Sequence, residues 1–310
     1  MTLINRLLIT LLLALFLWGC EAEVPVSGGY AVVYGISLYD PEYEEGAENT
    51  LNLTYSNDDA VSVAAMFEDA NYNVLLRTDT QATVENLAAD IAYVSERISS
   101  NENFVFYFSG HGVGARFSGY EAGDEPAGRD ANDEWIFLYG SIDNGHLADI
   151  DAALSDDGLL TMIDHLPTSR RIVVLDACNS GGFIGSEAEI DLLPQNSAED
   201  AGEGFIDAVK KYFDGAVTGN ADIPSSKALL ITAAGEQEDT YEAEALEHGI
   251  FTYYFLNAPF EGDSNGDGYV TVGECFYYTS TMIETEWESF FSPRISGGAV
   301  DIVLFKSTGY

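Results

Sequence analysis

Two side chains that could act as a nucleophile and its base each follow a short apolar run. His111 comes shortly after residues 104–108 (FVFYF), and Cys178 comes directly after residues 171–177 (RIVVLDA). A cysteine attacks a carbonyl carbon as the thiolate, and an imidazole can accept its proton. If the two runs are neighbouring parallel strands, their carboxyl ends share one edge, so the sequence predicts a Cys–His dyad there. The amides of Gly112 and Cys178 would then bind the developing oxyanion.

The other histidines and the cysteine near the C-terminus are interpreted as structural. A lone cysteine is usually packed in the core, and a lone histidine is usually a hydrogen-bonded polar residue. The combined context of the predicted dyad, a nucleophile and a base that each follow an apolar strand and have glycines nearby, is not found for His146, His165, His248 and Cys275.

Apolar strands and amphipathic helices alternate along the part of the sequence that must position the dyad. Strands are predicted at residues 30–36, 72–77, 104–108, 171–177 and 227–233, with a short one at 135–139. Helices are predicted at residues 57–70, 83–100 and 159–166. This alternation is typical of an α/β domain with a mainly parallel central sheet and helices on both faces. A last strand at 301–305 is expected to pair back onto the main sheet.

Several motifs in the predicted order resemble those of caspase-like cysteine peptidases, particularly bacterial metacaspase-like members of the clan of caspases, legumains and gingipains. They are YFSGHG at 107–112 and DACNSG at 176–181, supported by GISLY at 35–39, SND at 56–58 and HGIFTY at 248–253. The resemblance runs from about Tyr30 to Leu256. It implies a three-layer caspase-like fold and a cysteine endopeptidase that uses His111 and Cys178 through an acyl-enzyme.

The resemblance also implies an acidic pocket for the residue before the scissile bond, at the positions of Asp58 and Asp176. Two carboxylates favour an Arg or Lys side chain, so a protein or peptide substrate with basic residues is expected. The alternatives are a helix-capping role for Asp58 and hydrogen bonds from loop amides for Asp176. Cleavage after Asn or Asp by the same dyad also stays open, as does a catalytically silent, calcium-stabilised surface binding module.

Residues 186–226 correspond to the region that caspase-like enzymes often cut in themselves. Lys210 and Lys211 are adjacent basic residues in this acidic stretch and are possible processing sites. Alternatively, they are the positively charged C-terminal end of a helix over residues 205–213.

Residues 263–274 (DSNGDGYVTVGE) fit the calcium-binding loop of an EF-hand position by position. The expected oxygen ligands are Asp263, Asn265, Asp267, Tyr269 through its carbonyl, Thr271 and Glu274. Gly268 would permit the sharp turn, and helices at 250–256 and 275–287 would flank the loop. The alternative is a surface loop of Asx turns without metal. We expect a structural Ca²⁺ and no organic cofactor.

The first 19 residues carry one positive charge, Arg6, and the apolar run 7–18, which is typical of a signal peptide. The run ends in LWGC, which resembles a lipobox, so Cys20 is the expected site of lipid attachment. A plain signal peptide is the alternative. We therefore predict an exported, lipid-anchored protein of the bacterial cell envelope, with a tether at 20–29, a peptidase domain at 30–260 and an integrated calcium-loop segment at 261–310.

Composition narrows the classes of partner. The 310 residues are 46% hydrophobic, which is enough for a sizeable core. There are 52 Asp and Glu against 12 Lys and Arg, a formal net charge of −40. Such a surface repels phosphate backbones, which argues against a nucleic-acid partner, and attracts cations and basic substrates. Adaptation to a salty habitat is an alternative cause of the charge.

Overall fold

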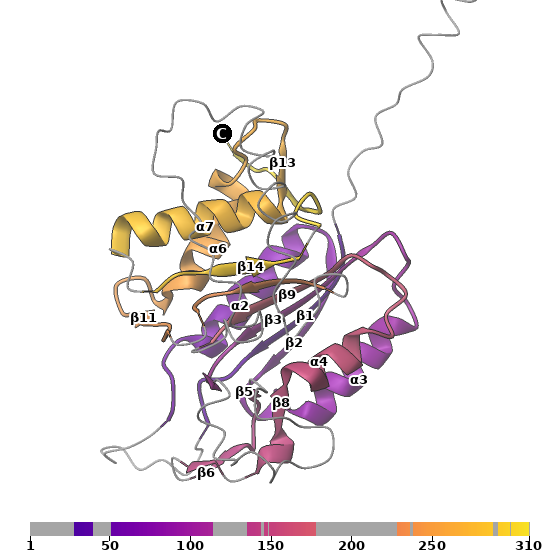
Figure 1. The fold of residues 1–310 in the computed structure, drawn as a ribbon, viewed down its shortest axis with the longest axis vertical. Helices are drawn as coiled ribbons and strands as arrows, with labels where there is room; N and C mark the ends of the chain where they lie inside the picture. The colour runs from indigo at the N-terminus through magenta and orange to yellow at the C-terminus, as the bar shows by residue number, and fades with distance from the viewer. Residues whose placement is uncertain are drawn as a thin grey trace, which may run out of the picture.

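The computed structural model describes residues 28–39, 51–113, 135–143, 146–147, 149–177, 228–235, 238–287, 291–297 and 299–309. Its centre is a six-stranded sheet in the order β14-β10-β9-β3-β1-β2 (Figure 1). The parallel strands are β1 (Gly29–Gly35), β2 (Tyr72–Thr78), β3 (Asn103–Ser109), β9 (Arg171–Asp176) and β10 (Leu229–Thr232). The antiparallel edge strand is β14 (Arg294–Ser296). The predicted mainly parallel sheet is confirmed.

Helices cover both faces of this sheet. Alternate residues of each strand point to opposite sides, so the apolar strands contribute buried side chains to both helical layers. One face packs against α2 (Ser56–Asp69), α6 (Ile250–Glu261) and α7 (Val272–Trp287). The other packs against α3 (Val84–Ser95) and α4 (Asp156–Ile163). Figure 1 shows the two helical layers on either side of the strands. The predicted three-layer α/β architecture is confirmed.

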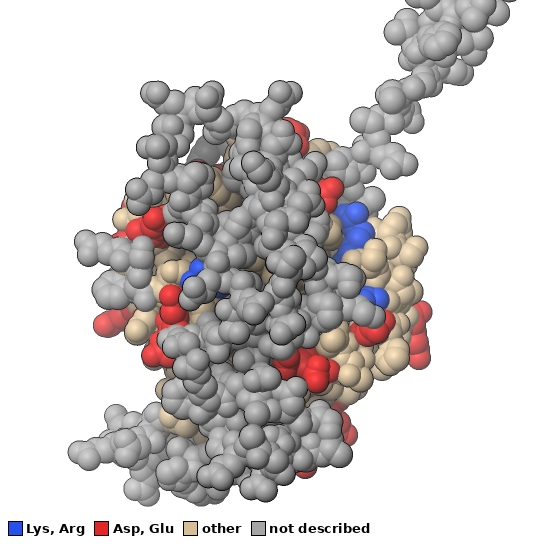
Figure 2. All heavy atoms as spheres, viewed as in Figure 1, with Lys and Arg blue, Asp and Glu red and all other residues tan. Residues whose placement is uncertain are grey.

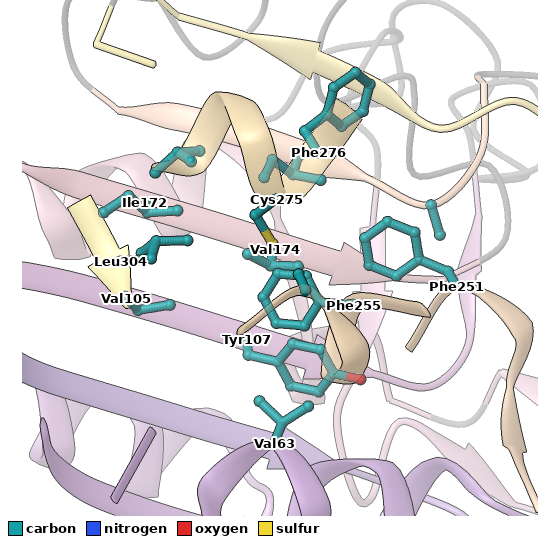
Figure 3. Packing of buried hydrophobic residues seen from close by; sticks show 14 of the residues in the cluster. Val63, Val105, Tyr107, Ile172, Val174, Phe251, Phe255, Cys275, Phe276 and Leu304 are labelled. Atoms are coloured by element: carbon teal, nitrogen blue, oxygen red, sulfur yellow. The ribbon is translucent and has the colours of Figure 1, made fainter. Parts of the chain in front are cut away.

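The strands that carry the site are apolar throughout because both of their faces are buried. On β3, Val105 and Tyr107 face α6, whereas Phe104, Phe106 and Phe108 join the core on the opposite face. Figure 3 shows Phe255 of α6 between Val174 of β9 and Tyr107 of β3, and it shows Ile172 and Val105 beside Leu304 in the same buried cluster. Cys275 of α7 is fully buried in the same cluster, where it packs as the sequence interpretation expected.

Short strands and turns surround the sheet. One group joins β4 (Gly112–Val113), β5 (Trp135–Phe137) and β8 (Ala153–Ser155). Two hairpins are formed by β6 (Ile142–Asp143) with β7 (His146–Leu147) and by β11 (Glu242–Ala243) with β12 (His248–Gly249). The 3₁₀ turns are η1 (Asp79–Gln81) and η3 (Ile150–Ala152).

The C-terminal strand does not join the main sheet, and that expectation was wrong. Strand β15 (Val303–Lys306) pairs antiparallel with β13 (Tyr269–Thr271), while β14 occupies the edge of the main sheet beside β10. Strand β14, which precedes β15 in the chain, therefore occupies the edge of the main sheet next to β10. The C-terminal segment still shares the core, since the rings of Phe305 and Phe67 lie 5.4 Å apart.

Candidate active site

Strands β3 and β9 are hydrogen-bonded neighbours, which is the condition on which the predicted dyad depended. Ser109 is in register with Asp176, and the Gly110 N–H donates to the Asp176 carbonyl at 3.1 Å. His111 lies two residues beyond this matched pair. Cys178 is two residues beyond Asp176 in the sequence but lies outside the described residues, as do Lys210 and Lys211.

The His111 side chain is held by a carbonyl that the sequence analysis did not find. Its Nε2 lies 2.6 Å from the Leu51 carbonyl oxygen. With the proton on Nε2, the ring donates to Leu51, and Nδ1 is left as the nitrogen that can accept a proton. Burial lowers the pKa of His111, which favours the neutral imidazole that a general base requires.

Tyr39 fixes the main chain and the ring of His111. The His111 N–H donates to the Tyr39 hydroxyl at 2.8 Å, and this hydroxyl donates to the Phe137 carbonyl at 3.0 Å. The Tyr39 and His111 rings lie 4.8 Å apart. A Cβ at Gly110 would lie 2.5 Å from the Tyr39 hydroxyl, so a larger residue there would displace the hydroxyl that binds the His111 N–H. Gly112, the predicted oxyanion donor, begins β4 next to His111 and pairs with Ile136 of β5.

The two carboxylates assigned to the specificity pocket have different surroundings. Asp176 is buried, and its Oδ2 accepts from the Thr252 N–H at 3.2 Å and the Thr252 hydroxyl at 2.6 Å. Asp58 is exposed in the first turn of α2. The carboxyl that lies beside Asp176 is that of the next residue, Asp59. Asp59 precedes Val63 by four residues and Phe67 by eight, so helical spacing places it on the buried stripe of α2.

Asp59 is fully buried and collects donors from two other elements. Its carboxylate accepts from the Ser109 hydroxyl at 3.1 Å and from the Gly249 N–H at 3.2 Å. The Nδ1 of His248 lies 2.7 Å from Asp59 Oδ1. His248 therefore belongs to this cluster, although it was predicted to be only a structural residue. The other predicted structural histidine whose side chain is described, His165, is exposed.

Further acidic side chains lie around this edge of the sheet. The Glu242 carboxylate accepts from the main-chain N–H groups of Thr54 and Tyr55 at the start of α2. Partial burial and four nearby carboxylates raise the pKa of Tyr55; the carboxylates are those of Glu244, Glu247, Glu242 and Asp58. On the face shown in Figure 2, acidic side chains are spread widely and basic ones are confined to a few places. The edge that carries His111 is therefore strongly acidic.

The segment predicted to bind Ca²⁺ forms a tight loop between α6 and α7. Gly266 and Gly268 have positive φ angles, and Asp263 accepts from the main-chain N–H groups of Gly266, Asp267 and Gly268 at 2.8–3.2 Å. Glu274 is buried and accepts from Thr271 and Ser264. The atoms that could bind a metal ion in this loop are oxygens, which a hard cation such as Ca²⁺ prefers as ligands. Across the described part of the chain, however, no three His, Cys, Asp or Glu side chains gather closely enough to hold a metal.

The predicted signal peptide and Cys20 lie outside the described residues. Within the ranges that the structure does describe, none of the helices has both the length and the apolar character needed to cross a membrane.

Comparison with known proteins matches most of the chain to one family. The model of the caspase domain matches residues 28–276. Metacaspase-1 of Pyricularia oryzae is 30% identical over 210 residues, covering 58% of this chain and 50% of that protein. Metacaspase-4 of Arabidopsis thaliana is 28% identical over 194 residues, covering 58% of this chain and 41% of that protein. The chain thus spans about half the length of the curated relatives it matches.

A solved structure is similar over nearly the whole fold. The crystal structure of protein GSU0716 from Geobacter sulfurreducens superposes with a TM-score of 0.55 and 20% sequence identity. The match covers 88% of this chain and 94% of that one. At this identity the likeness shows the fold alone.

Proposed function

The chain belongs to the caspase domain family, and on that premise we propose that it is a cysteine endopeptidase whose dyad is His111 and Cys178. The observation that carries the proposal is the setting of His111. Its ring follows β3, next to the strand that leads to Cys178, and its Nε2 is bound to a carbonyl so that Nδ1 can accept a proton.

The proposed reaction has two stages. The Cys178 thiol passes its proton to His111 Nδ1, and the sulfur attacks the scissile carbonyl carbon. The tetrahedral oxyanion is bound by the amides of Gly112 and Cys178. It collapses as the C–N bond breaks and the leaving amine takes the proton from His111, which leaves a thioester. Water then adds to the thioester, His111 removes the water's proton and returns it to the sulfur, and the acid product leaves.

We propose that cleavage follows Arg or Lys. Asp176 offers a buried carboxylate, and Asp58 and Glu242 add negative charge near the same edge. Both hydrogen bonds from Thr252 go to Oδ2 of Asp176, so with respect to the described residues Oδ1 is left to bind a guanidinium or ammonium group. A pocket for Asp would need basic side chains instead, and the whole chain has only 12 Lys and Arg.

A panel of fluorogenic peptides that differ only in the residue before the cut tests this function. We expect the full chain to cleave the Arg and Lys peptides and to leave the Asn and Asp peptides nearly intact. Cys178→Ala should abolish cleavage, whereas Cys275→Ala should retain it because that thiol is fully buried in the core. Cleavage after Asn or Asp would overturn the specificity. No cleavage of any peptide would favour a silent binding module.

The calcium loop is a separate proposal that rests on its oxygen donors and its two glycine turns. We expect Ca²⁺ to raise the Tm of the full chain and a chelator to reverse the rise, because binding to the native state alone stabilises it. At 100 times the dissociation constant this amounts to about 2.7 kcal/mol. Glu274→Gln should remove the response, and Glu284→Gln, an exposed position on α7, should keep it. An equal response in both variants would contradict a site in this loop.

We also propose export and lipid attachment at Cys20, because the apolar run of residues 7–18 stops two residues before that cysteine. Incorporation of labelled palmitate in bacterial cells should depend on Cys20. Equal labelling of Cys20→Ala would contradict the anchor.

A further inference from the structure

Two buried carboxyl groups from different elements meet at Gly249. A Cβ built on Gly249 would lie 2.7 Å from Asp176 Oδ2 and 2.9 Å from Asp59 Oδ2. The two oxygens are therefore no more than 5.6 Å apart, the sum of these two distances. Asp59 is 0% exposed and Asp176 is 5% exposed, so water screens neither charge well. Buried carboxylates this close do not both ionise readily unless a positive charge lies nearby.

In the described part of the chain, His248 is the ionisable group with a positive form that contacts the pair. Its Nδ1 lies 2.7 Å from Asp59 Oδ1, and its side chain is 20% exposed. Among the residues that the structure describes, the other groups that face the cluster are acidic or neutral. Tyr107 and Ser109 come from β3, Thr252 from α6, Asp58 from α2, Glu242 from β11, and Glu247 from the turn before β12.

We propose that His248 is a specificity-determining residue that acts through Asp176. By pairing with Asp59, it supplies the positive charge that allows Asp176 to be negative when a basic substrate side chain arrives. This proposal rests on the Arg or Lys specificity proposed above. In it, His248 favours the ionised form of Asp176, whereas Asp59 disfavours it. Asp59 adds a second negative charge beside Asp176 and so works against its ionisation.

The ionisation of the three groups is consistent with this arrangement. Burial, and after it the Asp59 charge, raises the pKa of Asp176 to about 7. Burial also raises the pKa of Asp59, while the hydrogen bond and charge of His248 oppose that rise. The hydrogen bond to Asp59 raises the pKa of His248, which keeps this imidazole positive to a higher pH. The charge of Asp176 therefore changes near neutral pH.

The two halves of the ion pair should consequently have opposite effects. His248→Gln removes the positive charge but keeps a polar side chain, so a proton is held more tightly between Asp59 and Asp176. Asp59→Asn removes a negative charge, so Asp176 ionises at lower pH. If the pair served only to hold the fold together, both variants would weaken the protein in the same direction.

The test measures kcat/KM for an Arg peptide and for the matched citrulline peptide between pH 5.5 and 8.5. Citrulline has nearly the same shape as Arg without the charge, so the ratio cancels the titration of His111 and Cys178. The full chain, His248→Gln and Asp59→Asn are compared, with the exposed His165→Gln as the control.

The expected changes in the ratio have opposite signs. With a pKa of about 7, roughly a tenth of Asp176 is ionised at pH 6, so Asp59→Asn should raise the ratio there by up to about tenfold. His248→Gln should lower the ratio at pH 7.5 by about tenfold and move its rise to higher pH. His165→Gln should match the unaltered chain. Equal ratios in all proteins, or a fall in both variants of the pair, would overturn the proposal.

A second measurement separates this inference from the proposed peptidase activity. Agmatine, a small guanidinium compound, is titrated by calorimetry into Cys178→Ala alone and into Cys178→Ala combined with each substitution, at pH 6 and pH 8. Tighter binding with Asp59→Asn at pH 6 and weaker binding with His248→Gln at pH 8 would support the inference even without cleavage. Absence of binding to all three, together with absence of cleavage, would overturn both proposals.

Discussion

His111→Ala is expected to lower kcat/KM for an Arg peptide by about 10³-fold, with most of the loss in kcat. The reason is that a positioned acid–base group contributes roughly 10²- to 10⁴-fold. The Nε2 bond to the Leu51 carbonyl leaves Nδ1 as the nitrogen that can accept a proton, and no other histidine whose side chain is described contacts this edge of β3 in the same way. Steady-state kinetics with His165→Ala as the control provide the measurement.

The same variant should change the chemistry of the thiol even without substrate. Alkylation of Cys178 by iodoacetamide, followed by mass spectrometry of its peptide, should need higher pH in His111→Ala because no imidazole accepts the proton. Cys275 provides an internal comparison, since burial raises the pKa of its thiol strongly and excludes the reagent. An unchanged alkylation profile, together with unchanged kcat, would contradict the role of His111 as the base.

Asp176→Asn is expected to reduce cleavage of an Arg peptide and to stabilise the free protein at alkaline pH. Losing one partner of a buried charge pair costs ~3 kcal/mol, which is about a hundredfold in kcat/KM. The stability effect has the opposite sign. The carboxyl ionises near pH 3.8 in the unfolded chain but only at about pH 7 in the folded one. Folding stability therefore falls as pH rises between these values, and the loss is complete above pH 7.

Thermal unfolding at pH 5 and pH 8 measures this effect. The Tm of Asp176→Asn should exceed that of the unaltered chain by several degrees at pH 8, and the difference should be much smaller at pH 5. Asp301→Asn, at an exposed position, should show no such pH-dependent difference. A variant that is less stable at both pH values would mean that the carboxylate contributes more through its bonds to Thr252 than it costs through burial.

The sequence by itself determined the fold class and indicated the pair of neighbouring strands after which the dyad is predicted. The apolar runs are local patterns with strand periodicity, and the segments between them have helical spacing, so their order indicates a parallel sheet without long-range information. The motifs around His111 and Cys178 indicated one sheet edge, and the register of Ser109 with Asp176 confirms that β3 and β9 are neighbours. Helical spacing in α2 also held a signal for the buried Asp59, which the motif-based choice of Asp58 passed over.

Only the tertiary structure decided which groups surround His111, the base of the proposed dyad, and which join Asp59. A main-chain carbonyl has no sequence signature, because every residue has one, so the role of Leu51 could not be predicted. Asp59 and His248 are separated by 189 residues, and their contact depends on how α2 packs beside β12. The edge position of β14 and the pairing of β15 with β13 were decided in the same way. Contacts between distant segments follow from packing, which local patterns do not encode.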